Sequence, residues 1–231
     1  MQYFTPDFLE FFKELAGNNH KSWFDENRKR YEKVVKEPFK KFVGDLIEEV
    51  KSNCEPELLI APKDAIFRIN RDIRFAKDKT PYKTNVSAVL SPKGRKNQSY
   101  AAHYFELSPE HIGIYGGMYG GKTDAVLALR THIGNNIKTF NKLISDEAFL
   151  SHFPEGIKGE VQKRVPKELK VLAEKHSVLF QKQFYYHTNL DPELVYSKEL
   201  MPTMLEYVKA GHELKSFLRQ PFDSLSLVPE H

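Results

Sequence analysis

The chain has a single cysteine, Cys54, among its 231 residues. One cysteine excludes an intrachain disulfide and a metal cluster built from several thiolates, and this scarcity is typical of reducing compartments. No apolar run approaches the roughly 18 residues that a membrane-spanning helix needs. The first residues lack a basic stretch and carry Asp7 and Glu10 among apolar side chains, unlike a secretory signal peptide. We therefore expect a cytoplasmic protein that does not cross a membrane.

Motifs for metal-based or nucleophilic catalysis are also scarce. The nine histidines are scattered and form no close pair of the H-x-x-x-H type, so we predict no metal site. The G-x-S-x-G motif of serine hydrolases is missing, and Cys54 lies in a polar stretch without a basic partner in sequence. The sequence identifies no cofactor, and it leaves open the oligomeric state and the question of whether the protein is an enzyme.

Hydrophobic periodicity changes twice along the chain. We expect a helical N-terminal segment over about residues 5–52, a strand-rich segment over about 60–120, and a helical and mixed part over about 122–225. Short turns between consecutive strands favour an antiparallel sheet. Strands and helices do not alternate strictly, which indicates the α+β class. We predict a single domain over residues 1–231, with a mostly antiparallel sheet covered by helices and a long C-terminal helix.

Individual elements follow from the same patterns. The first helix is predicted to begin at Thr5-Pro6-Asp7, with Thr5 as its cap, and Pro38 is predicted to restart the helical pattern later in this segment. The long C-terminal helix is predicted to begin near Ser197. The segments predicted as strands are Ala88–Leu90, Ala102–Leu107, His111–Tyr115, Ile157–Val165 and Ser177–His187.

One segment, FRINRDIRFAKDKTPYKTN from Phe67 to Asn85, has a strong excess of positive charge. It holds six basic and two acidic residues, whereas the rest of the chain balances 29 basic against 29 acidic residues. The segment therefore accounts for the net charge of +4. If Ala65–Phe75 is extended, Arg71 lies on the apolar face of the strand and needs a partner, because an unpaired buried charge is costly.

We interpret this segment as a site for an anionic or phosphate-bearing small molecule, since guanidinium groups suit phosphate and carboxylate. If the site is catalytic, Asp72 and Asp78 are its carboxylates and Tyr82 is a proton donor. The residues proposed to bind the ligand are Arg68, Arg71, Arg74, Lys79, Lys83 and Asn85.

Two alternatives use the same segment differently. A non-enzymatic protein could bind nucleic acid or a protein partner through it, together with the basic turn Lys93–Lys96. Alternatively, the arginine and aspartate side chains only pair with one another and tie the loop to the sheet. Ordinary charged runs are solvated surface, so the sequence alone does not decide among these interpretations.

A second motif, Gly116–Thr123, matches the P-loop pattern G-x-x-x-x-G-K-[ST]. In a P-loop the backbone N–H groups hold the phosphates and the lysine reaches them, so Gly116, Gly117 and Lys122 are further ligand-binding candidates. Against a P-loop, Ile112–Tyr115 is not a long apolar strand, and no later apolar strand ends in an aspartate for magnesium. In a weaker version, a glycine-rich helix start binds an anion through its backbone amides.

The run Arg68–Phe75, continuing through Asp78–Lys83, resembles the hallmark of a bacterial and fungal family catalogued as domain of unknown function 2461. The other features that support the resemblance are Phe8-Leu9, Trp23-Phe24 with Asn27 and Tyr31, Gly116-Gly117, Arg130, and Lys163-Arg164-Val165-Pro166-Lys167. The resemblance covers nearly the whole chain. It implies a single-domain soluble protein without an established activity. Because the family hallmark is dense in arginine, aspartate and tyrosine, the resemblance also favours the interpretation of residues 67–85 as a functional site.

Overall fold

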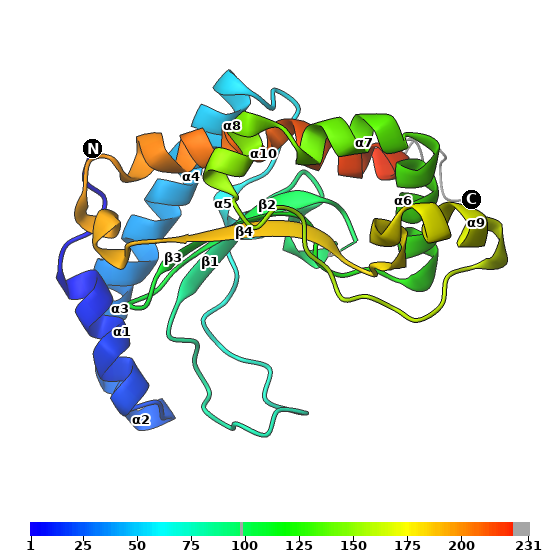
Figure 1. Ribbon diagram of the computed structural model, residues 1–231. Helices are drawn as coiled ribbons and strands as arrows, with labels where there is room; N and C mark the ends of the chain where they lie inside the picture. Colours follow the sequence, from blue (N-terminus) through cyan, green and yellow to red (C-terminus); the bar gives the residue numbers. More distant parts are fainter. Residues whose placement is uncertain (98, 224–231) are drawn as a thin grey trace, which may run out of the picture. The chain divides into compact units, whose positions relative to one another are not determined.

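A computed structural model of the protein describes residues 1–97 and 99–223. This part of the chain has an α+β structure with a four-stranded antiparallel sheet in the order β1-β2-β3-β4 (Figure 1). The predicted class, the mostly antiparallel sheet, the helical N-terminal segment and the long C-terminal helix are confirmed. The strands are β1 (Val86–Leu90), β2 (Ala102–Leu107), β3 (Ile112–Met118) and β4 (Phe184–Leu190).

Helices precede the sheet, separate β3 from β4, and follow β4. The first group comprises α1 (Asp7–Gly17), α2 (Lys21–Glu26), α3 (Arg28–Tyr31), α4 (Glu37–Asn53) and α5 (Pro62–Ala65), with a π-helical turn over Glu32–Lys36. The second group comprises α6 (Thr123–Asn135), α7 (Ile137–Ile144), α8 (Glu147–His152) and α9 (Lys170–Lys175). The last described helix is α10 (Leu200–Asp223). Short 3-10 turns lie at Gly94–Lys96, Lys167–Leu169, Ser177–Phe180 and Pro192–Tyr196.

Two prolines lie at helix beginnings in the N-terminal segment. Pro6, rather than the predicted Thr5, is the cap residue of α1, and no side chain caps this helix. Pro38 occupies one of the first two positions of α4, directly after the π-helical turn. Because proline has no N–H, a widened turn just before it avoids a hydrogen bond that a regular helix would require. The predicted restart at Pro38 is thus a π-turn within a nearly continuous helical stretch.

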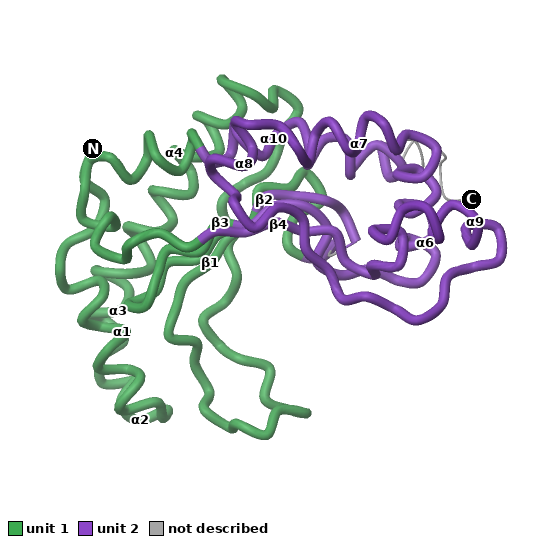
Figure 2. The backbone as a smooth tube through the Cα atoms, viewed as in Figure 1, with its two compact units in different colours: residues 1–95, 104–114, 189–206 green, residues 96–103, 115–188, 207–231 purple. Residues whose placement is uncertain are grey.

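The contacts divide the chain into two compact units (Figure 2). Unit 1 comprises residues 1–95, 104–114 and 189–206. Unit 2 comprises the described residues within 96–103, 115–188 and 207–231. The expectation that the whole chain is one domain stays a prediction. In neither unit, over the residues that the structure describes, is a helix long and apolar enough to span a bilayer.

The core of unit 1 is built from aromatic side chains on α1, α4 and β2. Phe42 and Phe105 meet edge to face with ring centroids 5.9 Å apart, and Phe39 lies 6.0 Å from the same ring. Successive residues of a strand point to opposite faces. Since Phe105 packs on α4, its neighbours Tyr104 and Glu106 lie on the opposite face of β2, where both are half-buried.

The two strands predicted after residue 150 differ from the structure. Residues 157–165 form only isolated bridges, which pair Lys158 with Tyr185 and Val161 with Gln181. Between these bridges residues 159 and 160 oppose residues 182–184, a bulge that interrupts regular pairing. Within the bulge, a Cβ on Gly159 would overlap the Gln183 carbonyl oxygen. The segment predicted from residue 177 begins as a 3-10 turn, and its strand begins only at residue 184.

Tyr186 on β4 is fully buried and determines the packing of unit 2. Its hydroxyl donates a hydrogen bond of 2.7 Å to the carbonyl of Gly211 on α10, which satisfies a polar group that burial would otherwise penalise. Its ring lies between Gly116 of β3 and Gly211, and a Cβ on either glycine would overlap it. Phe153 of α8 packs on the same ring with centroids 4.6 Å apart.

Replacement of Gly116 by alanine should destabilise the protein by about 1–3 kcal/mol, the usual cost of overpacking a core, because the new methyl group overlaps the Tyr186 ring. Equilibrium urea denaturation measures the change in unfolding free energy. Gly17→Ala is the control, since nothing lies within 4 Å of a Cβ at Gly17. A Gly116→Ala protein as stable as the wild type would contradict this packing.

Candidate functional site

The predicted binding segment, residues 67–85, forms an irregular two-stranded loop, here called the arm, which precedes β1 and is drawn in cyan in Figure 1. Isolated antiparallel bridges join Ile66 to Ala88 and Asn70 to Tyr82. Residues 65–75, whose extended form was considered above, form no regular strand. Their cross-arm pairing is limited to these bridges and a few backbone hydrogen bonds, such as Arg71 N–H to the Pro81 carbonyl at 2.9 Å.

Asn19, which lies just before α2, holds the arm at Tyr82. The Asn19 side-chain amide donates to the carbonyl of Tyr82 at 2.9 Å, and its oxygen accepts from the Tyr82 N–H at 3.1 Å. The Tyr82 ring stacks on Phe24 with centroids 4.0 Å apart, and burial raises the pKa of its hydroxyl. Tyr82, predicted as a proton donor, thus packs as an anchor of the arm.

Arg71, which interrupted the apolar alternation, has its partners within the arm. Its Nη1 donates to Asp78 Oδ2 at 2.5 Å, to the Thr80 carbonyl at 3.1 Å, and to the Thr80 hydroxyl. Asp78 in turn accepts from the Thr80 N–H at 2.9 Å. That backbone bond and the Arg71 guanidinium lower the pKa of Asp78. The three residues close the turn of the arm.

A second pair lies nearer the tip. Arg74 forms a two-pronged ion pair with Asp72, with Nε–Oδ1 at 3.0 Å and Nη2–Oδ2 at 2.7 Å, which lowers the pKa of Asp72 to about 2. Lys79 donates to the Ile73 carbonyl at 2.9 Å. The predicted binding groups Arg71, Arg74 and Lys79 are therefore engaged inside the arm. The predicted catalytic carboxylates are paired with arginines, and at neutral pH neither has the proton that a general acid requires.

The end of the arm that joins β1 meets a carboxylate on the sheet. Glu106 Oε2 accepts from the Tyr104 hydroxyl at 2.9 Å and from Asn85 Nδ2 at 3.3 Å, and Glu106 Oε1 lies 3.2 Å from His111 Nε2. The Asn85 Oδ1 atom is buried and has no hydrogen-bond partner among the described residues. Glu106 thus gathers polar groups from the arm, β2 and the residue before β3.

Lys83 and Arg68, the remaining predicted cations of the arm, lie near this carboxylate. Lys83 Nζ lies 5.3 Å from the centroid of the Phe67 ring. Burial lowers the pKa of Lys83, the Glu106 carboxylate opposes that shift, and Arg68 adds to it. Arg68 is exposed and forms no ion pair within the described part of the chain. Of the predicted ligand set, the structure brings together Arg68, Lys83 and Asn85.

Removal of the Glu106 charge should lower the pKa of Lys83 further. Coulomb attraction to the carboxylate favours the charged amine, so in Glu106→Gln only burial and Arg68 act on it, and both lower the pKa. A pH titration of the Lys83 methyl signals by NMR, after reductive 13C-methylation, measures the change. Glu110→Gln removes an exposed charge nearby in sequence and should leave the titration of Lys83 unchanged. A higher Lys83 pKa in Glu106→Gln would refute the assignment.

The glycines of the P-loop pattern serve packing in unit 2. Gly116 and Gly117 lie inside β3, and Gly117 has φ 97°. A Cβ on Gly117 would overlap the Phe184 carbonyl of β4, as one on Gly116 overlaps the Tyr186 ring. A P-loop follows a parallel strand and wraps around phosphate, whereas here the first two glycines of the pattern belong to an antiparallel strand pair. The geometry gives them no phosphate contact.

Four later residues of the pattern, Tyr119, Gly120, Gly121 and Thr123, border a cavity of about 450 Å³ within unit 2, at the beginning of α6. This volume lies in the range typical of small-molecule sites, about 300–1,000 Å³. The lining includes three cationic side chains and no acidic one. The lining residues are Tyr119, Gly120, Gly121, Thr123, Val126, Leu127, Arg130, Gln162, Arg164, Val165, Pro166, Lys182 and Gln183. Lys122 is exposed beside this lining and is not part of it.

Arg130 of α6 is the most deeply placed charge of this cavity, with only 4% of its surface exposed. Its Nε donates to the Gln181 carbonyl at 2.9 Å, and its Nη2 donates to Gln162 Oε1 at 2.7 Å and to the Phe180 carbonyl at 3.2 Å. Burial lowers its pKa. Within residues 1–97 and 99–223 its hydrogen bonds go to neutral acceptors, and no carboxylate forms an ion pair with it. A buried cation therefore borders a cavity without a counter-charge.

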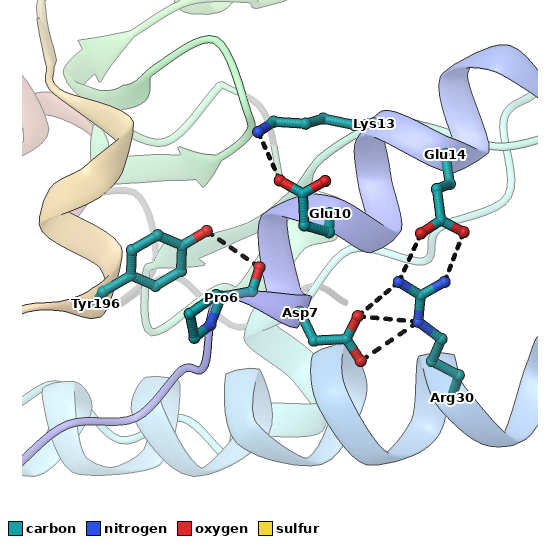
Figure 3. Close-up of polar contacts among 7 residues, drawn as sticks. All are labelled: Pro6, Asp7, Glu10, Lys13, Glu14, Arg30 and Tyr196. Carbon is teal, nitrogen blue, oxygen red and sulfur yellow. Dashed lines mark hydrogen bonds and ion pairs between the residues drawn. The ribbon is translucent and has the colours of Figure 1, made fainter.

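Arg30 shows how the same side chain is neutralised elsewhere in the protein. Figure 3 shows its guanidinium between the carboxylates of Asp7 and Glu14. The bonds are 3.0 Å from Nε to Asp7 Oδ1 and 2.7 Å from Nη1 to Glu14 Oε2. These carboxylates raise the pKa of Arg30, and Arg30 lowers that of Glu14. Arg30 is thus a structural link between α1 and α3, and its charge is balanced.

Glu106, which contacts Asn85, Tyr104 and His111, was not predicted from the sequence as part of a site. Arg130 and Arg164 were named above only as features of the family resemblance. Strand alternation over residues 102–107 could have placed Glu106 on the same face as Tyr104. Nothing in the sequence connects Arg164 with α6, because the two are joined only by tertiary packing. Among the described residues, no cluster of three potential ligands from His, Cys, Asp and Glu could hold a metal ion.

Comparison with known proteins identifies the family to which the sequence is similar. The model of a family described as "Conserved hypothetical protein (DUF2461)" matches residues 7–217. Neither a curated protein nor a solved structure matches the chain. The matched range includes the arm, the Glu106 cluster and all residues that line the cavity.

Proposed function

The chain belongs to the DUF2461 family of conserved hypothetical proteins, and from the geometry we propose that it binds a small anionic or phosphate-bearing molecule in the cavity at the beginning of α6. The observation that carries this proposal is Arg130, a buried guanidinium at the cavity with no carboxylate partner in the described chain. An uncompensated buried charge is costly. A bound anion would supply the missing charge.

The other lining residues suit the same ligand. Arg164 is exposed and forms no ion pair with any described residue, so its guanidinium fork is available to phosphate oxygens. Lys182 also lines the cavity, but it forms an ion pair with Glu160 at 2.6 Å and so adds less net positive charge to the site. Gln162 and Gln183 add neutral donors, while Val126 and Val165 provide apolar wall.

The helix start contributes weakly. Lys122 is the cap residue of α6 and its side chain caps no N–H group. The N–H groups and the positive dipole end of a helix start favour an anion. However, Asp124 Oδ1 already accepts from the Ala125 N–H at 2.9 Å and brings a negative charge to the first turn. The proposal therefore rests on Arg130 and Arg164 and not on the amides predicted from the P-loop pattern.

The lining supports binding more directly than catalysis. Among the residues around the cavity there is no histidine, cysteine or carboxylate that could transfer a proton or attack a substrate. The arm retains Lys83, whose pKa is lowered by burial, and neither Lys83 nor Glu106 lines the cavity at α6. An anion-binding role is what we propose, and the expected cytoplasmic location stays a prediction.

Pyrophosphate should raise the melting temperature of the protein, because a ligand of the native state stabilises it by about 2.7 kcal/mol at a hundred times its Kd. Arg164→Ala should weaken pyrophosphate binding by roughly tenfold or more, the cost of losing a charge-assisted hydrogen bond. Titration calorimetry measures the Kd. Arg164 is preferred over Arg130 for this test, because Arg130 also holds the backbone of residues 180 and 181.

Lys163→Ala is the matched control. Lys163 is the exposed neighbour of Arg164, carries the same charge and does not line the cavity. Its loss should leave pyrophosphate binding within about twofold, the size expected for a screened surface charge. Equal losses from both substitutions, or a melting shift that sodium chloride reproduces at the same ionic strength, would rule out a specific site.

A further inference from the structure

The tip of the arm displays an aromatic ring to solvent. Phe75 is 95% exposed, the most exposed large apolar side chain in the described part of the chain. Scattered apolar residues on a surface are ordinary, but a nearly bare phenyl ring at the end of a projecting loop forgoes the burial that such a side chain favours. The position is therefore suited to contact with another molecule.

The tip is held in place by its own side chains. The Arg71–Asp78–Thr80 contacts close the turn on one side, and Lys79 donates to the Ile73 carbonyl across it. Further back, Asn19 clamps the arm at Tyr82. A loop fixed in this way presents its exposed groups in one geometry, which reduces the entropy lost on binding.

The charges of the arm that remain after internal pairing are positive. Both acidic residues of the arm are neutralised, Asp72 by Arg74 and Asp78 by Arg71. Arg68 and Lys77 have no carboxylate partner among the described residues, and Lys79 contacts only a carbonyl. The arm thus combines an aromatic ring at its tip with two cations that lack a carboxylate partner among the described residues, Lys77 close to the tip in sequence and Arg68 nearer the sheet. The other charges of the chain balance.

We propose that the arm binds single-stranded nucleic acid, with Phe75 stacking on an unpaired base and Arg68, Lys77 and Lys79 contacting phosphates. Aromatic side chains combined with cations are the usual means of recognising single strands. Every base has a face on which an aromatic ring can stack, so we expect little sequence preference. This proposal is independent of the cavity at α6, because the two use different residues.

A membrane surface fits the tip less well. The Arg74 guanidinium lies 5.9 Å from the centroid of the Phe75 ring, and Arg74 and Asp72 are both largely exposed. Insertion of Phe75 into hydrocarbon would carry this ion pair towards the bilayer interior, which is costly. Stacking on a base leaves the ion pair in water, beside the phosphates.

Fluorescence anisotropy with a labelled 20-nucleotide oligo(dT) probe at about 50 mM salt tests the proposal. Phe75→Ala should weaken binding by about 5- to 150-fold, the range for loss of one stacking contact, and Phe75→Trp should retain it. Lys77→Ala should reduce the slope of log affinity against log salt by about 0.7, the value for one phosphate contact on a single strand. Leu59→Ala, which removes another exposed apolar side chain, should leave binding unchanged.

Three results would overturn the proposal. One is the absence of oligo(dT) binding by the wild-type protein at this salt concentration. Another is equal affinity of wild type and Phe75→Ala for the oligonucleotide, which would reduce the contact to nonspecific charge. The third is a Phe75→Ala protein that no longer binds phosphatidylserine vesicles, which the wild type binds, but still binds the oligonucleotide as the wild type does. That result would assign the tip to a membrane surface instead.

Discussion

The N–H groups of a buried guanidinium need acceptors, and the acceptors that Arg130 uses organise one side of unit 2. Its hydrogen bonds join α6 to the backbone at Phe180 and Gln181 and to the side chain of Gln162. These segments are the ones that border the cavity. Carbonyls and an amide satisfy hydrogen bonds, but they do not cancel a unit charge. The interaction that shapes the cavity therefore also leaves it electropositive.

Arg130 differs from the arginines that have carboxylate partners. Arg30, Arg71 and Arg74 each have carboxylate partners, and their role is to join α1 to α3 or to close the arm. Such pairs near the surface contribute little stability on their own, but they fix geometry. Arg130 has only neutral acceptors in the described chain and is the more deeply buried. Burial without a counter-charge is what distinguishes a candidate anion site from a structural ion pair.

Much of the fold was predictable because it depends on local periodicity. Strand β2 has the predicted bounds, Ala102–Leu107. The charged segment was also located correctly as a feature, since its composition differs from the rest of the chain. The pairing inside it was not predictable: Arg71 meets Asp78 and Thr80 only because the arm folds back on itself. Gly116 was predicted to bind a ligand, but it is needed for packing against the Tyr186 ring. The sequence alone does not distinguish a glycine required by a neighbouring ring from one required by a bound phosphate.

The cavity was the least predictable feature, since it joins residues near 120, 130, 162–166 and 182 through tertiary packing alone. The central proposal is that an anion binds beside Arg130 in this cavity. It can be tested by following the arginine side-chain N–H resonances by NMR during a pyrophosphate titration. The account predicts saturable shifts of Arg130 and Arg164 with a common midpoint, and no shift of Arg30, which two carboxylates already neutralise. Shifts of all three that rise together without saturation, or no shift of Arg130, would contradict it.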